Sequence, residues 1–232
     1  MELISYIIIF FLILSPIFYG VKYKELSWVI IGYIMLFIIS ALRFDIGNDY
    51  KNYFYLAQEY ANLIRNSNIL YTWHYYGERH ELSFVLLSWF FSYTEKPFVW
   101  INVIYSAIYV VLLYSIFKKY DVLLKGIIII IISGFLFFSW DGIRQGVAVV
   151  SVLYAIHYVR IGKFEKFCIW IFVAFLFHKS SIYLLPLYGC RYFKLNNSLI
   201  NICISVSYII FLSGYMNIIL DNVTSYFQYI QT

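Results

Sequence analysis

Long apolar runs separated by short basic loops constrain this chain more than any other feature of its sequence. Residues 3–19 and 26–42 form the first two runs, and further runs follow as far as residue 214. A helix needs about 20 apolar residues to cross a bilayer, and only helices and closed barrels satisfy their backbone hydrogen bonds in lipid. Only 12% of the 232 residues are charged, compared with about 25% in soluble domains. The sequence therefore predicts an all-α, polytopic integral membrane protein.

We expect about seven to nine transmembrane or half-membrane helices, within a single transmembrane domain that covers residues 1–232. The first run lacks the basic flank and small-residue cleavage site of a signal peptide, so we expect it to remain as a helix. Segment 82–93 is too short to span and is expected to dip into the membrane or pack at its surface. The two short segments 167–177 and 182–189 are expected to be halves of a broken helix. The expected membrane segments are residues 3–19, 26–42, 82–93, 98–117, 126–140, 143–159, 167–177, 182–189 and 199–214.

Basic residues gather in the loops on one side of this arrangement. Under the positive-inside rule that side is the cytoplasm. The opposite side of the membrane then receives residues 43–81, the start of segment 143–159 and the end of segment 167–177. The net charge of +5 follows from the basic loops, so we expect the bilayer as a partner and no nucleic acid. These loops contain Lys22 and Lys24, Lys118 to Lys125, Arg160 to Lys166, and Arg191 with Lys194.

Residues 43–81 form the longest polar stretch of the chain. Its first half has apolar residues at helical spacing, which predicts an amphipathic helix lying on the membrane surface. Its second half, residues 66–80, is rich in tyrosine, tryptophan and histidine and is expected to be an ordered loop. The apolar positions of the amphipathic helix are Tyr53, Leu56, Ala57, Tyr60, Leu63 and Ile64.

Polar groups are concentrated where this stretch begins. One arginine, two carboxylates and an amide lie within residues 43–50. Polar chemistry packed against a bilayer is costly and is normally kept for function. Arg43 also fits an arginine that snorkels at a helix end, with Gly47 supplying the turn. Both interpretations remain open.

A second polar group, Asp141 to Gln145, begins a later helix. Asp141, Arg144 and Gln145 lie on one side of that helix. Asp141 is a natural cap for the helix N-terminus. Capping does not explain Arg144, because a guanidinium is unfavourable at the positive end of a helix dipole unless an anion is bound there.

A third polar group lies between two apolar segments, at His178 to Ser181. His178 fits either a satisfied residue at the membrane interface or the acid or base of a reaction. Glu81, at the start of the short apolar segment, fits either a helix N-terminal carboxylate favoured by the dipole or a catalytic group. We predict a structural role for His157, near the cytoplasmic end of its helix. Small hydrophobic roles are expected for Cys168, Cys190 and Cys203.

Two arginines, carboxylates and a histidine on one membrane face predict a site for an anionic headgroup with acid–base capacity. Arginine forks suit phosphate and cannot serve as a base. The expected substrate is therefore a phosphate or pyrophosphate attached to lipid.

These residues resemble the EpsG family of bacterial polysaccharide polymerases, which includes many O-antigen polymerases of the Wzy type. The resemblance runs from about Tyr33 to Pro186, and the ordered set of motifs is more specific than any one of them. The matching motifs are Arg43…Gly47-Asn48-Asp49-Tyr50…Tyr53, Glu81, Arg144-Gln145 and Phe177-His178-Lys179-Ser180.

The resemblance implies a membrane glycosyltransferase of the bacterial inner membrane, with its active site and the amphipathic helix on the periplasmic side. It would polymerise undecaprenyl-pyrophosphate-linked oligosaccharide repeat units into O-antigen or exopolysaccharide. Donor and acceptor are both lipid-linked glycans, and a chain-length regulator protein is a candidate partner. No metal and no cofactor are expected, because the arginines supply the positive charge. The catalytic candidates are Arg43, Arg144, His178, Asp49 and Glu81. The substrate-binding candidates are Asp45, Tyr50, Tyr53, Gln145 and Ser180.

Under this interpretation the two arginines neutralise the pyrophosphate leaving group. His178 or a carboxylate takes the proton of the acceptor hydroxyl, and the amide and tyrosines orient the sugars. A flippase or transporter for the same lipids is the alternative, although transporters usually show internal repeats, which are not visible here. An O-antigen ligase-like transferase, an acyltransferase and a structural membrane subunit also remain open.

Overall fold

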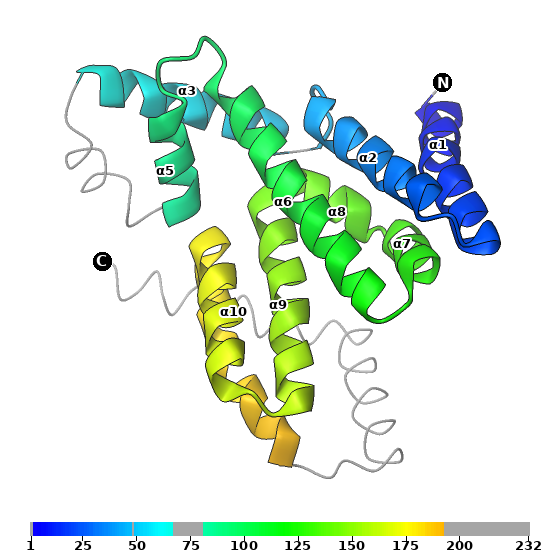
Figure 1. Ribbon diagram of the computed structural model, residues 1–232. Coiled ribbons are helices and arrows are strands. Elements are labelled where there is room, and N and C mark those ends of the chain that lie inside the picture. The colour runs from blue at the N-terminus through cyan, green and yellow to red at the C-terminus, as the bar shows by residue number, and fades with distance from the viewer. Residues whose placement is uncertain (1, 48, 67–80, 193–232) are drawn as a thin grey trace, which may run out of the picture. The chain divides into compact units, whose positions relative to one another are not determined.

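The computed structural model describes residues 2–47, 49–66 and 81–192 (Figure 1). Every regular element in these ranges is helical, and they contain no β-strand, which confirms the predicted helical class. The chain divides into two compact units, Met1–Tyr188 and Gly189–Thr232. All the helices considered below as parts of the site lie in the first unit. The single-domain interpretation stays a prediction.

The helix boundaries follow the apolar pattern closely. The second helix begins and ends where the second apolar run does, and the amphipathic helix is present. Expected segment 199–214 and loop 67–80 lie outside the described residues. The elements are α1 (Glu2–Tyr23), α2 (Leu26–Leu42), α3 (Tyr50–Asn66), α5 (Leu82–Phe90), α6 (Pro97–Lys119), α7 (Leu123–Ile132), α8 (Phe135–Asp141), α9 (Ile143–Ile161), α10 (Phe164–Phe177) and the 3-10 helix η1 (Lys179–Tyr192).

Helix α6 is the one helix of the described ranges that is by itself long and apolar enough to cross a membrane. A second span is obtained if α7 and α8 are counted together, although they are bent by 69°. The expected count of seven to nine spans is therefore not confirmed. The bend corrects the prediction of one continuous segment over residues 126–140: Gly134 adopts a left-handed φ of 73°, which ends α7 as glycine does at many helix termini.

Helix α3 is amphipathic, as predicted, but its apolar stripe packs on α5 and α6 of the same chain. Tyr60 is fully buried and meets the ring of Phe84 in α5, with 5.9 Å between ring centroids. Arg65 fixes the other end of α3, since it donates hydrogen bonds to the carbonyl oxygens of Ser92 at 2.5 Å and Thr94 at 3.0 Å. The α3 helix is thus held by protein contacts, whereas the sequence indicated only a membrane surface.

Buried polar contacts join the end of α2 to α6 and α8. The Asn102 amide of α6 donates to the carbonyl oxygens of Ser40 and Ala41 at 3.2 and 2.8 Å. The Trp140 indole of α8 donates to the Ser40 hydroxyl at 3.0 Å. Asn102 thus satisfies two of the last carbonyls of α2, and together with the Trp140 contact it fixes three helices beside the segment that begins at Arg43.

Helix α10 packs along α9, and the chain then folds back on it (Figure 1). Tyr188 of η1 contacts the rings of Phe164 and Phe167 in the first turn of α10, at centroid distances of 4.9 and 5.3 Å. Tyr188 therefore lies beside the beginning of α10. This arrangement places His178 at the turn between two antiparallel segments, as the pattern of residues 167–189 indicated.

Candidate functional site

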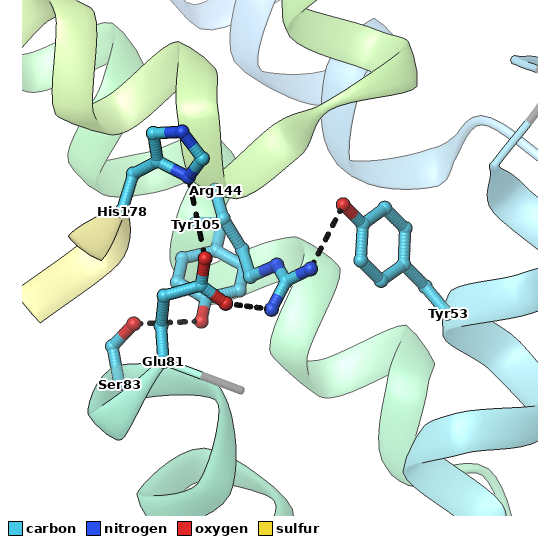
Figure 2. A network of polar contacts seen from close by, with 6 residues as sticks. All are labelled: Tyr53, Glu81, Ser83, Tyr105, Arg144 and His178. Atoms are coloured by element: carbon cyan, nitrogen blue, oxygen red, sulfur yellow. Dashed lines mark hydrogen bonds and ion pairs between the residues drawn. The ribbon is translucent and has the colours of Figure 1, made fainter. Parts of the chain in front are cut away.

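A single carboxylate joins two of the predicted site residues (Figure 2). Glu81 Oε2 forms an ion pair with Nη1 of Arg144, and Glu81 Oε1 lies 3.2 Å from Nδ1 of His178. The three residues come from three separate elements, 63 and 97 positions apart in the chain. The exposed fractions of the Glu81, Arg144 and His178 side chains are 11, 13 and 33%. The histidine is thus the most accessible member of the group.

Local backbone structure explains why these side chains converge. Glu81 is the residue before α5, and its carbonyl oxygen accepts the backbone N–H of Phe84 at 3.1 Å. Arg144 is the second residue of α9, which starts after Gly142. His178 has an extended backbone and follows the last residue of α10. Each functional side chain therefore lies at a helix end, where the direction of the chain changes.

Aromatic rings enclose the guanidinium of Arg144. Its central carbon lies 4.8 Å from the ring centre of Tyr53 and 5.3 Å from that of Phe84. Its Nη2 atom also donates a hydrogen bond of 3.2 Å to the Tyr53 hydroxyl. Such cation–π contacts favour the charged form and fix the plane of the group. Nε of Arg144 is buried and has no hydrogen-bond partner among the described residues.

A tyrosine of α6 is buried beside the site and contacts a serine of α5. The Tyr105 hydroxyl lies 3.1 Å from the Ser83 hydroxyl (Figure 2), and Tyr105 is fully buried. The Tyr105 ring also meets Phe177, the residue before His178, at a centroid distance of 5.7 Å. Tyr105, Ser83 and Phe84 were not predicted from the sequence as site residues. They lie in apolar runs rich in aromatic residues, and no local signal marks them.

Arg43 lies in a different environment from Arg144. It is 6% exposed, and it donates to the carbonyl oxygens of Ser40 at 3.2 Å and Trp140 at 2.9 Å. Burial lowers the pKa of its guanidinium to about 10, partly opposed by the nearby Asp141, so the group stays charged at neutral pH. The structure thus places Arg43 at the junction of α2 and α8 and does not bring it into contact with the Glu81 group.

The remaining candidates near Arg43 are distributed around the start of α3. Asp45 has a left-handed φ of 51° and pairs with Lys51 at 3.2 Å. Asp49 is exposed and accepts a hydrogen bond of 3.4 Å from Asn52. Tyr50 is buried against the ring of Phe98, with 5.1 Å between centroids. Tyr50 therefore has the surroundings of a core residue, whereas the two aspartates face the exposed side.

Gly47 permits the close approach of this segment to α8. Its φ is 103°, and a Cβ atom there would lie 2.7 Å from the Asp141 carboxylate. Of the other two candidates, Gln145 is half-buried beside Gly142, and Ser180 is exposed. Among the described hydrogen bonds, none joins Gln145 or Ser180 to Glu81, Arg144 or His178.

A hollow of about 390 Å³ opens beside Arg144, and we call it the α3 hollow. One exposed stripe of α3 forms most of its wall, and Arg144 closes it on the α9 side. The described residues contain no group of three or more side chains arranged to hold a metal ion. The hollow is lined by Asp49, Asn52, Tyr53, Tyr55, Leu56, Glu59 and Arg144.

The geometry of Glu81 and His178 suits proton transfer. A neutral imidazole that donates its Nδ1 hydrogen to Glu81 presents Nε2 as an acceptor. Figure 2 shows this second nitrogen directed away from Glu81. Because a carboxylate that orients a histidine also stabilises its protonated form, the pair has the chemistry of a general base.

Comparison with known proteins gives one family match. The family model described as the EpsG family matches residues 25–232, a range that contains every residue of the site. This range extends beyond the residues 33–186 on which the sequence resemblance was based. No curated protein and no solved structure matches the chain. The family consists of membrane proteins similar to Wzy-type polymerases. The chain therefore belongs to the EpsG family, and it is a membrane protein of polysaccharide biosynthesis.

Proposed function

We propose that this protein is a glycosyltransferase that polymerises undecaprenyl-pyrophosphate-linked repeat units at the periplasmic face of the inner membrane. Membership of the EpsG family supports this class of reaction. The observation that carries the proposal is the Glu81 carboxylate, which contacts both Arg144 and His178. This contact joins a proton acceptor to a cation within one small site.

His178 is the general base of the proposed reaction. The acceptor hydroxyl oxygen attacks the anomeric carbon of the donor glycan, and its proton passes to Nε2 of His178. The bond between the anomeric carbon and the pyrophosphate oxygen breaks, and undecaprenyl pyrophosphate leaves with both bonding electrons. Glu81 keeps the imidazole in the required tautomer and stabilises the imidazolium that forms. The greater exposure of His178 supports this division of roles.

Arg144 supplies positive charge where the leaving group develops negative charge. Its aromatic surroundings hold the guanidinium in place before the reaction, which is the condition under which electrostatic stabilisation is strongest. Arg43 contributes a second positive charge without contacting the substrate, since its guanidinium donors bind carbonyl oxygens of the protein. With these cations present, the proposed reaction uses no metal ion and no cofactor. Asp49 and Tyr53, which line the α3 hollow, are proposed to contact sugar hydroxyls. A chain-length regulator is the proposed protein partner.

Deletion of the gene for this protein in its native strain tests the proposal against its alternatives. We expect single repeat units to accumulate on the carrier or on the surface glycolipid, because every step except polymerisation still operates. Loss of all surface glycan with repeat units retained in the cytoplasmic leaflet would indicate a flippase instead. Accumulation of long polymer on undecaprenyl pyrophosphate would indicate a ligase.

Complementation with His178→Ala then links the phenotype to the site. Wild-type protein should restore long chains, and the variant should restore none at an equal level in the membrane. A variant that restores full-length polymer would remove His178 from the mechanism.

A further inference from the structure

Helices α2 and α6 pack against each other (Figure 1) and leave an apolar groove between them, which we call the α2–α6 groove. Its volume is about 440 Å³, within the usual range for small-molecule sites of about 300–1,000 Å³. Ile34 and Val111 are 47 and 63% exposed, so the groove is open to the surroundings of the helices. It is lined by Ile30, Tyr33, Ile34, Phe37, Ala107, Val110, Val111 and Tyr114.

The lining offers a ligand mainly apolar contact. Only two of the eight lining residues, Tyr33 and Tyr114, carry a polar group in the side chain. The Tyr33 hydroxyl donates to the carbonyl oxygen of Leu123 in α7 at 3.2 Å, and its ring meets that of Tyr114 edge to face at a centroid distance of 5.2 Å. The groove therefore fits a hydrocarbon chain better than a polar solute.

The position of the groove along α6 places it at membrane depth. Helix α6 is long enough to cross a bilayer, and the lining residues of α6 lie between Ala107 and Tyr114. This stretch covers about 10 Å of helix axis, or about a third of the roughly 30 Å hydrocarbon core. A groove at this depth is surrounded by lipid chains.

A lysine stands at one end of the groove. Lys118 Nζ lies 5.5 Å from the ring centre of Tyr114. The spacing of Ala107, Val111, Tyr114 and Lys118 is four, three and four residues, so all four lie on one face of α6. Because one helical turn of about 6 Å separates Tyr114 from Lys118, the apolar stripe leads directly to a cation.

Two further lysines add positive charge beside Lys118. Lys119 of α6 and Lys166 of α10 lie 5.5 and 5.7 Å from the ring centre of Tyr158 in α9. Among the ion pairs of the described residues, none involves these three lysines or Asp121, the carboxylate in the turn after α6. The end of the groove therefore favours an anion, since opposite charges attract at short range.

We propose that the α2–α6 groove binds an anionic phospholipid, with one acyl chain in the groove and the phosphate at Lys118. Lysines at the end of a membrane helix are a general means of attracting anionic headgroups. The positive-inside rule assigns this end of α6 to the cytoplasmic leaflet. Tyr105, beside the Glu81 group, lies about 20 Å away along the helix axis, so the lipid is bound apart from the proposed reaction. The inference does not depend on the proposed function.

Native mass spectrometry of the purified, delipidated protein in detergent tests the proposal. The probes are phosphatidylglycerol, which is anionic, and phosphatidylcholine with the same acyl chains, which is zwitterionic. Phosphatidylglycerol should bind the wild type at least about fivefold more tightly, and Lys118→Gln should reduce this preference by about fivefold, the usual effect of one basic residue near a lipid surface. Val111→Trp should prevent binding of both lipids, because the larger side chain fills the groove.

Matched controls come from exposed positions outside the groove. Ile169 of α10 is 58% exposed, and Lys163, before α10, is exposed as well. Ile169→Trp and Lys163→Gln should bind both lipids as the wild type does. Because Val111 and Lys118 are also exposed, all four variants are expected to fold, and their thermal transitions without added lipid verify this.

Thermal stability gives a second measurement. Phosphatidylglycerol should raise the melting temperature of the wild type more than that of Val111→Trp or Lys118→Gln, because a ligand of the folded state stabilises it by mass action. Equal binding of the two lipids by the wild type, or wild-type binding by Val111→Trp, would overturn the proposal.

Competition distinguishes the phospholipid from other sources of phosphate. Inorganic phosphate at the concentration of the lipid should leave the bound phosphatidylglycerol in place, because it makes no contact with the groove. Displacement by inorganic phosphate would identify a free-anion site instead. Displacement by an equal concentration of undecaprenyl phosphate would assign the groove to the carrier lipid, and the phospholipid proposal would be wrong.

Discussion

The imidazole of His178 and the carboxylate of Glu81 meet at 3.2 Å, although 97 positions separate them in the chain. The contact forms because α5 packs against α10, so that the start of α5 lies beside the end of α10. The side chain of each residue is held in position by a residue from the other helix end.

A double-mutant cycle tests whether these two residues act as a unit. Removal of a general base typically costs about 10²–10⁴-fold in rate, so His178→Ala should reduce turnover of lipid-linked repeat units by at least about 100-fold. Glu81→Gln should cost a similar factor, because the amide no longer stabilises the imidazolium. The double variant should be no slower than His178→Ala, since residues that act as a unit are not additive.

The control for this cycle is Glu95→Gln, a change at an exposed carboxylate in the turn before α6. It should leave turnover unchanged. Independent, multiplicative losses from Glu81→Gln and His178→Ala would show that the two residues do not share a function.

Arg144→Lys is expected to fail although it preserves charge. The guanidinium contacts Glu81 and the Tyr53 hydroxyl with different nitrogens, and an ammonium group does not reproduce this fork. Loss of one preorganised donor typically costs about 10²–10³-fold, so long polymer should disappear from gels of surface glycan. Arg160→Lys, in the last turn of the same helix, is the matched control and should give normal ladders. Normal ladders from Arg144→Lys would mean that charge alone is sufficient.

Arg43→Met is expected to act on stability as well as on activity. It removes buried donors to the Ser40 and Trp140 carbonyls, but the Ser40 carbonyl still accepts a hydrogen bond from Asn102. Loss of the donor to one buried carbonyl costs about 1–3 kcal/mol, so we expect the free energy of unfolding to fall by this amount, measured as a lower melting temperature in detergent. Arg65→Met, which also removes donors to two carbonyls but at an exposed position, should cost less. A melting temperature equal to that of the wild type would contradict the structural role of Arg43.

The sequence predicted the elements well where a local signal marks their ends. Lys22 lies in the last turn of α1 and Lys24 follows its end, and the polar residues after Phe177 end α10. The break between α7 and α8 was missed because it lies inside an apolar run and depends on the left-handed conformation of Gly134.

The candidate site was predictable as a list of residues but not as a set of contacts. Arg144, Glu81 and His178 were recognised because charged groups are rare beside apolar runs. Their mutual contacts depend on the packing of three helices, which periodicity does not specify. The same limitation applies to Arg43: its position at a helix end was evident, and its two carbonyl partners were not.

Cysteine labelling tests whether the site faces the periplasm. Helix α6 is long enough to cross the bilayer, and it ends at Lys118 and Lys119, which the positive-inside rule assigns to the cytoplasm. In a background with the native cysteines replaced by serine, Asp45→Cys and Ser180→Cys should react with a membrane-impermeant maleimide in intact cells with a permeabilised outer membrane. Lys119→Cys should react only after the inner membrane is opened. Because Ser180 is two residues from His178, labelling of position 180 from the cytoplasm alone would place the catalytic group on the wrong side for periplasmic polymerisation.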